Sequence, residues 1–169
     1  DLLNNKKIND PFIGLNEIDL QWIANENWIY KQSFIPDADI FEMGFVILRF
    51  QGLDTYASVF LNGNEILKAD NMFHPWEVDV KHLLKKGENE LLIEFESPIQ
   101  KILPKMKHMD YELPADNDQI GKTSPFTRKA PYHYGWDWGP AFATSGIWKS
   151  VELFCYDSLF IENIFIEQN

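Results

Sequence analysis

The sequence contains a single cysteine, Cys155, so no disulfide bond can form within the chain. It has no apolar run that approaches the roughly 18 residues needed to span a bilayer, and its opening residues, DLLNNKKIND, lack the hydrophobic segment of a signal peptide. Positive charge is also scarce, because 15 Lys and Arg stand against 26 Asp and Glu, for a net charge of −11. We therefore expect neither a membrane nor a nucleic-acid partner, since phosphate binding needs a surplus of Lys and Arg. The compartment stays open, and a soluble periplasmic, secreted or lysosomal protein is compatible with the sequence.

Aromatic residues, by contrast, are abundant. The 169 residues include six Trp, six Tyr and thirteen Phe, which together make up 15% of the chain. This length suits one domain, and a chain of this size buries enough surface to fold without a metal or disulfide. Aromatic side chains are typical of a packed β core, and they also offer flat apolar faces to sugar rings. Composition alone favours the core.

Short apolar or alternating runs recur along the chain between turn signals. They predict eight strands, at residues 28–34, 45–50, 56–61, 65–68, 76–80, 90–96, 147–154 and 159–166. The Asn62-Gly63 dipeptide predicts a tight hairpin between the third and fourth strands. Residues 1–20 have weak periodicity and are expected to form an arm with at most one short strand. Many short strands favour a mainly β fold, an antiparallel β-sandwich of the jelly-roll type.

Fifty residues, 97–146, separate the sixth predicted strand from the seventh. A structureless loop of that length is uncommon unless it has a function. Its first part has apolar residues at helical spacing: Ile99, Ile102, Leu103 and Met106. Pro98 suits the start of that helix, and Pro104 is expected to kink or restart it. We expect a long, partly helical insertion that lies across one end of the sandwich.

The insertion carries an aromatic cluster, YHYGWDWGP, at residues 132–140. Gly and Pro disrupt strand ladders, so this stretch is expected to be a loop. Two Trp beside one Asp suit a neutral sugar, because an indole covers the apolar face of the ring and a carboxylate accepts hydrogen bonds from hydroxyls. Alternatively, Trp136 and Trp138 plug the open end of the sandwich while Asp137 caps a turn.

Other candidate groups carry less information. Arg128 and Lys129 precede the cluster, and they could pair with carboxylates in a pocket or simply solvate the loop. The four histidines show no metal-ligand spacing: His74, His82, His108 and His133. We expect no metal and no cofactor.

The segment RKAPYHYGWDWGPAFATSGIWKSVEL, residues 128–153, resembles β-mannosidases of the glycoside hydrolase family 2 group. Members share an Arg-Lys pair, an aromatic stretch, Trp-Asp-Trp-Gly-Pro, and Thr-x-Gly-Ile-Trp-Lys before a strand. Residues 52–80 and 84–98 are similar to earlier parts of the same domain, so the resemblance covers about residues 20–155. Pro131 and His133 depart from the family pattern.

The resemblance implies a domain organisation. Residues 1–157 look like the N-terminal, galactose-binding-like jelly roll of such an enzyme, and residues 158–169 look like the link into an immunoglobulin-like domain. A TIM barrel further along supplies the acid/base and nucleophile glutamates of a retaining glycosidase. These residues themselves would therefore contain no catalytic group, and the chain alone is expected to be inactive.

The resemblance also implies site residues. Trp136 and Asp137 would form part of the wall of the barrel's pocket, against the terminal non-reducing β-D-mannosyl unit of a β-mannoside. Trp138 would face the jelly-roll core, and Arg128 and Lys129 would support the site from behind. The partners would be the β-mannoside, the barrel and the immunoglobulin-like domain. The alternative is a free-standing, lectin-like carbohydrate-binding module.

Overall fold

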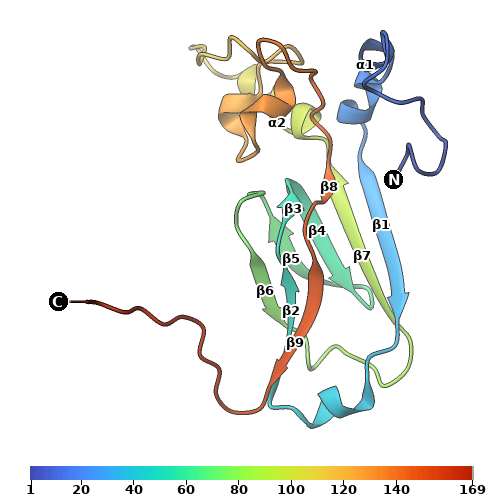
Figure 1. Cartoon of the computed structure of the whole chain (residues 1–169), viewed down its shortest axis with the longest axis vertical. Coiled ribbons are helices and arrows are strands. Elements are labelled where there is room, and N and C mark those ends of the chain that lie inside the picture. The colour runs from blue at the N-terminus through green and yellow to red at the C-terminus, as the bar shows by residue number, and fades with distance from the viewer. Residues whose placement is uncertain (169) are drawn as a thin grey trace.

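The computed structural model describes residues 1–168 and is built mainly from antiparallel strands (Figure 1). The strands are β1 (Trp28–Phe34), β2 (Phe45–Phe50), β3 (Leu53–Asp54), β4 (Tyr56–Leu61), β5 (Asn64–Ala69), β6 (Trp76–Asp79), β7 (Asn89–Glu96), β8 (Gly146–Ile147) and β9 (Val151–Tyr156). The α-helices are α1 (Asn16–Asp19) and α2 (Pro98–Met106). The 3-10 turns are η1 (Gln21–Asn25), η2 (Ala38–Glu42), η3 (Ser124–Phe126) and η4 (Pro131–Tyr134).

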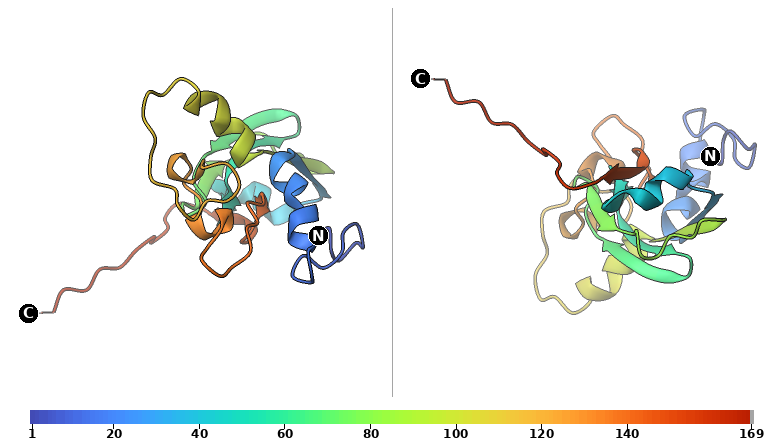
Figure 2. Two further views of the ribbon diagram at one scale, coloured as in Figure 1. Left: turned by 90° about the horizontal axis from the view of Figure 1, so that it is seen from above. Right: turned by 90° about the horizontal axis from the view of Figure 1, so that it is seen from below.

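Two antiparallel sheets pack face to face in two layers (Figures 1 and 2). One sheet has the strand order β1-β7-β4-β5 and the other has the order β6-β2-β9. A two-residue ladder between β3 and β8 forms a small third sheet. The predicted β-sandwich is confirmed. The predicted seventh strand is divided between β8 and β9, which lie in different sheets.

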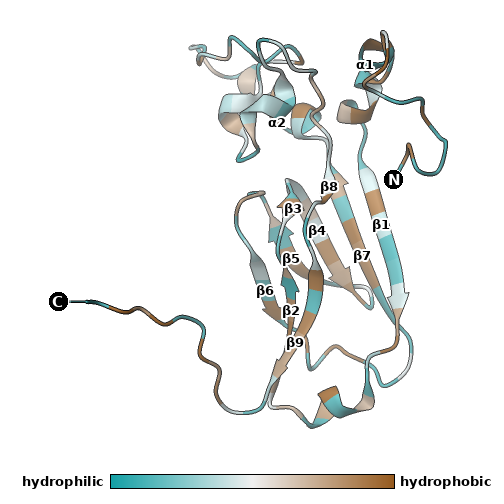
Figure 3. Ribbon diagram, in the orientation of Figure 1, coloured by the Kyte–Doolittle hydropathy of each residue, from teal (hydrophilic) through white to brown (hydrophobic). Residues whose placement is uncertain are grey.

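The core lies between the two sheets and follows the two-residue period of the strands. In β7, Ile93 and Phe95 are buried whereas Glu94 and Glu96 are exposed, and Figure 3 shows the same alternation of hydropathy along the strands. The hydrophobic side chains that lose almost all contact with water are Val46, Phe50, Leu53, Val59, Leu61, Val80, Ile93 and Phe95.

The Asn62-Gly63 hairpin between β4 and β5 is confirmed. Both residues have positive φ, 51° and 82°, which is the backbone that this tight turn requires. The Asn62 side chain donates hydrogen bonds to the Leu83 carbonyl oxygen at 2.9 Å and to Asn89 Oδ1 at 2.8 Å. The hairpin is therefore tied to the turn before β7.

The insertion begins with α2, which lies across one end of the sandwich as expected (Figures 1 and 2). Ser97 caps the helix, because its Oγ accepts a hydrogen bond from Gln100 N at 3.1 Å, and Pro98 is the first helical residue. Ser97 Oγ also donates to the Ala24 carbonyl oxygen at 2.7 Å, which fastens α2 to η1. The helix continues through Pro104 to Met106, so the predicted restart at Pro104 is wrong. Proline so near the end removes only one late hydrogen bond.

Residues 1–20 form the expected arm, which contains only turns and α1. One further expectation is corrected. Residues 159–166 are not a strand: they extend away from the sandwich (Figure 1), and their apolar side chains are exposed. A strand needs a neighbour for its backbone N–H and C=O groups, and this segment has none among residues 1–168. No helix in the described part of the chain is long and apolar enough to cross a membrane.

The packing predicts how truncations in neighbouring strands differ. We expect Phe95→Ala to lower the free energy of unfolding by about 3–5 kcal/mol, because it empties a filled site between the sheets. Ile29→Ala in β1 is the control, since Ile29 is 64% exposed, and it should cost less than about 1 kcal/mol. Urea denaturation of both variants measures the difference, and equal losses would contradict this location of the core.

Candidate functional site

The predicted aromatic cluster begins within η4 and continues into the loop between η4 and β8, across the same end of the sandwich as α2 (Figure 1). Tyr134, at the end of η4, is completely buried and packs with residues of η1 and α2. Beyond it the side chains turn outward: Trp136 is 43% exposed and Trp138 is 83% exposed. Tyr134, and not either Trp, therefore fills the end of the sandwich.

Gly135 makes this change of direction possible. Its φ of 134° lies in a region that favours glycine, and a Cβ atom there would lie 2.3 Å from the Asn117 carbonyl oxygen. The segment around Gln119 runs close to the segment around Gly135, and Gln119 N donates a hydrogen bond to the Tyr134 carbonyl oxygen at 2.9 Å. The two segments can pack in this way only if residue 135 has no side chain.

Residues 136–138, the loop tip, present two indoles and one carboxylate at the surface. The Trp136 and Trp138 rings meet edge to face, with centroids 5.9 Å apart. Asp137 is exposed and forms no salt bridge within residues 1–168. The arrangement offers apolar faces and a free hydrogen-bond acceptor to a polar ligand that has one apolar side.

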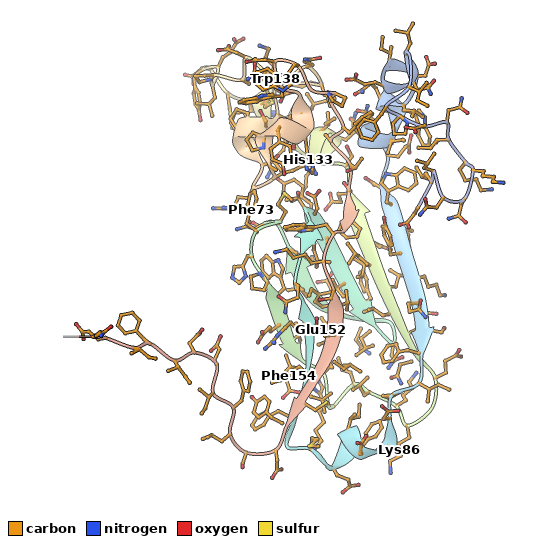
Figure 4. The ribbon with its side chains drawn as sticks, viewed as in Figure 1. Phe73, Lys86, His133, Trp138, Glu152 and Phe154 are labelled. Carbon is orange, nitrogen blue, oxygen red and sulfur yellow. The ribbon has the colours of Figure 1, made fainter. Side chains whose placement is uncertain are left out.

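The structure corrects one expectation about the loop tip: the prediction that Trp138 faces the core is wrong. Trp136 and Asp137 also lie at the surface, which a pocket wall shared with another domain requires. Residues 135–145 form neither helix nor strand, so the period that separates inward from outward residues does not apply to them. Figure 4 shows Trp138 at the outer surface of the loop and His133 between it and the strands.

Arg128 and Lys129 are neighbours in sequence with opposite surroundings. The Arg128 side chain is 70% exposed, and its guanidinium lies 3.9 Å from the Asp70 carboxylate. The Lys129 side chain is completely buried: its Nζ donates hydrogen bonds to Asp54 Oδ2 and, at 2.6 Å, to the Thr144 carbonyl oxygen. Of the two roles considered for this pair, Arg128 solvates the loop, and Lys129 pairs with a buried carboxylate.

The Lys129–Asp54 pair is the centre of a small polar cluster inside the domain. Asp54 Oδ1 accepts a hydrogen bond from the Thr55 hydroxyl, and His133 Nδ1 lies 3.8 Å from Asp54 Oδ2. Burial lowers the pKa of Lys129, and the attraction of Asp54 partly opposes this change. Burial and the Lys129 charge lower the pKa of His133, again against Asp54. His133 is therefore held neutral beside a charged pair.

Sequence reasoning did not single out Asp54 or assign a role to His133. One signal was available: Asp54 follows Leu53 and lies two residues before the apolar strand that begins at Tyr56. If such a carboxylate is buried, leaving it unpaired is costly, so a cation is expected beside it. The choice of that cation required the fold, because Lys129 is 75 residues away.

A groove of about 760 Å³ opens beside this cluster, between the N-terminal arm and the loops at the end of the sandwich. Asp54 and His133 form part of its wall. Most of its lining is apolar and much of it is aromatic: Phe12, Trp28, Tyr30, Phe73, Tyr132, Phe142 and Trp148. A smaller hollow of about 300 Å³ lies under Trp136.

Within residues 1–168, no three His, Cys, Asp or Glu side chains come together in a group suited to a metal ion.

The lowered pKa of His133 predicts a pH dependence of stability. An unfolded histidine has a pKa near 6.5, and the pKa of folded His133 is lower. Around and below pH 6.5 the unfolded chain therefore binds more protons than the folded chain. The free energy of unfolding should therefore fall as the pH decreases from about 7.5 to 5.5. His133→Gln should reduce this slope, whereas His108→Gln, at an exposed position, should keep it. Urea midpoints across the range measure both, and an unchanged slope in the His133 variant would refute the assignment.

Comparison with known proteins places this architecture in a family. Residues 1–149 match the family described as glycosyl hydrolase 2 galactose-binding domain-like. The chain is 40% identical over 159 residues to Beta-mannosidase B of Thermothelomyces thermophilus, and the aligned region covers 94% of this chain and 18% of that protein. It is 41% identical over 160 residues to Beta-mannosidase B of Emericella nidulans, and the aligned region covers 94% of this chain and 19% of that protein.

A solved structure gives the same result. The crystal structure of β-D-mannosidase from Dictyoglomus thermophilum superposes with a TM-score of 0.86 at 43% identity, over 93% of this chain and 19% of that one. The chain thus spans about a fifth of the length of the relatives it matches. Because the superposition covers nearly all of this chain, the two proteins share the fold of this domain. The chain therefore belongs to the glycosyl hydrolase 2 family, as a galactose-binding-like domain of the kind found in β-mannosidases.

Proposed function

We propose that this chain is the N-terminal domain of a retaining β-mannosidase that hydrolyses terminal non-reducing β-D-mannosyl residues. Its loop tip would form part of the active-site wall of a TIM barrel that lies elsewhere in the polypeptide. The observation that carries the proposal is the loop tip itself: two indoles and an unpaired carboxylate stand exposed on a β-mannosidase-type domain. Exposed aromatic groups of this kind mark a surface that a ligand or another domain covers.

The proposed chemistry divides the work between domains. Retaining glycosidases use two carboxyl groups about 5–5.5 Å apart, one as acid/base and one as nucleophile, and barrel strand ends hold such groups. This domain would contribute binding. Asp137 would accept hydrogen bonds from sugar hydroxyls, and Trp136 would cover the apolar face of the ring. Contacts that strengthen as the ring distorts towards the oxocarbenium-like transition state accelerate the reaction.

The exposure of Trp138 changes its proposed role. At 83% exposure it belongs to the same surface as Trp136 and is available to the barrel or to the sugar. Arg128 lies on the outside of the domain and would support the loop from there. Lys129 would support it from inside.

The domain organisation is also a proposal. We infer that residues 1–157 form the jelly roll and that residues 158–169 lead into an immunoglobulin-like domain. Within this segment Leu159, Ile164 and Phe165 are 80%, 77% and 90% exposed, and Figure 3 shows it as an apolar stretch that leaves the sandwich. A following domain would cover these side chains and provide the missing strand neighbour.

One observation favours a second candidate, a free-standing carbohydrate-binding module. The 760 Å³ groove has an aromatic lining with a few polar groups in its wall, which is the general character of a small-ligand site. Such a module would bind sugar without a barrel.

The role of Asp137 predicts a loss of turnover. In the polypeptide that carries the catalytic barrel, Asp137→Ala should reduce kcat/KM for a β-mannoside about ten- to two-hundredfold, since a hydrogen bond to a charged group contributes roughly 1.5–3 kcal/mol. Asp37→Ala is the matched control, because Asp37 is exposed beside η2, and it should leave turnover unchanged. Steady-state kinetics on an aryl β-mannoside measure both, and wild-type efficiency in the Asp137 variant would rule the role out.

The isolated chain separates the two candidates. As one wall of a pocket it should hydrolyse no β-mannoside and bind mannose or mannobiose only at about millimolar affinity, because a few exposed hydrogen bonds barely offset the cost of immobilising a ligand. Isothermal titration calorimetry measures the affinity. Binding in the low micromolar range would instead favour the carbohydrate-binding module.

A further inference from the structure

Lys129 connects two segments that lie far apart in sequence. Its buried ammonium group donates to the Asp54 carboxylate at the end of β3, 75 residues away, and to the Thr144 carbonyl oxygen, 15 residues away. Since Lys129 and Thr144 are the two ends of the loop that carries the loop tip, one side chain holds both ends against the same strand. The three donors of an ammonium group allow this kind of branched connection.

The loop between these ends has little regular structure of its own. After η4, residues 135–145 form neither helix nor strand. Their further anchors come from the N-terminal arm: Ala141 N donates to Glu17 Oε1 at 2.7 Å, and Gln21 Nε2 donates to the Ala141 carbonyl oxygen at 2.9 Å. The loop tip lies between buried Tyr134 and these anchors. Its position therefore depends on how firmly the two ends are held.

We infer that Lys129 is a positioning residue for the loop tip: through the Lys129–Asp54 pair and the Thr144 carbonyl it fixes where Trp136 and Asp137 stand. The inference deepens the proposed function and rests on it. A buried ion pair adds little net stability, because the cost of removing its charges from water offsets much of their attraction. Here the hydrogen bonds select one arrangement of the loop, which an apolar contact of the same volume would not do.

Positioning matters for the proposed reaction because small displacements of binding groups are costly. A shift of about 1 Å in a group that orients the substrate can reduce the rate about a hundredfold. Loosening the loop should therefore reduce kcat more than it raises KM. The contacts that would weaken are those between the loop tip and the sugar ring in its distorted, transition-state-like form.

The test uses the intact polypeptide and a variant that leaves no buried charge. Lys129→Met alone would leave the buried Asp54 carboxylate without its cationic partner and could unfold the domain. The double variant Asp54→Asn, Lys129→Met keeps the volumes and removes both charges. Lys149→Met is the matched control, because Lys149 is exposed and lies against the Trp148 ring.

Hydrogen–deuterium exchange tests the attachment of the loop without reference to activity. In the double variant, amides of residues 130–146 should exchange about tenfold faster or more, while those of β4 and β7 keep their wild-type protection. The Lys149 control should resemble the wild type throughout. Unchanged exchange in the loop, or an equal rise in the strands, would overturn the inference.

Kinetics on a β-mannoside test the consequence and separate this inference from the proposed function. We expect the double variant to lose about tenfold or more in kcat with a smaller change in KM. If Asp137→Ala impairs turnover and the double variant does not, the positioning role of Lys129 is wrong and the proposed function stands. If Asp137→Ala has no effect, the proposed role of the loop tip in catalysis fails, whereas the exchange experiment still decides whether Lys129 holds the loop.

Discussion

Side chains from β2, β4 and β7 interlock between the two sheets, and residues such as Phe50 and Phe95 lose essentially all contact with water. Backbone ladders join the strands within each sheet, but the chain has one cysteine, so no internal disulfide links the two sheets. Apolar burial between the sheets, at about 25 cal/mol for each Å² removed from water, is therefore the main source of stability. The loops at the end of the sandwich can be irregular because this layer beneath them is rigid.

The insertion over that end is organised differently. Its segments are fixed by single polar side chains that reach several backbone groups: Ser97 caps α2 and holds η1, and the buried Asp118 accepts from the backbone N–H groups of Ile120, Gly121 and Ser124. Lys129 does the same from the loop side. These hydrogen bonds satisfy the backbone of irregular segments that share only a small apolar core around Tyr134. They leave the loop tip well placed and uncovered.

The surface of the domain is divided between charge and exposed apolar groups. A net charge of −11 keeps most of it polar. Large apolar side chains are nevertheless exposed at the loop tip, along residues 158–168 and on the N-terminal arm, where Phe12 is 75% exposed. A typical monomer exposes few large apolar patches unless they meet a ligand or a partner. Under the proposed function, a barrel would cover the loop tip and a following domain would cover residues 158–168. The chain itself spans about a fifth of the length of the relatives it matches.

Much of this could be predicted from the sequence, because strands, the Asn62-Gly63 hairpin and the capped start of α2 are set by local period, turn chemistry and capping. The motif around Trp136 and Asp137 also pointed to a loop, since Gly and Pro exclude a strand there. Local pattern could not decide which side of an irregular loop faces the core, so Trp138 was misplaced and Tyr134 was overlooked. It could not pair Asp54 with Lys129 either. Partners 75 residues apart meet only because the sheets bring β3 beneath the insertion, and the need to neutralise a buried carboxylate then determines which lysine goes inside.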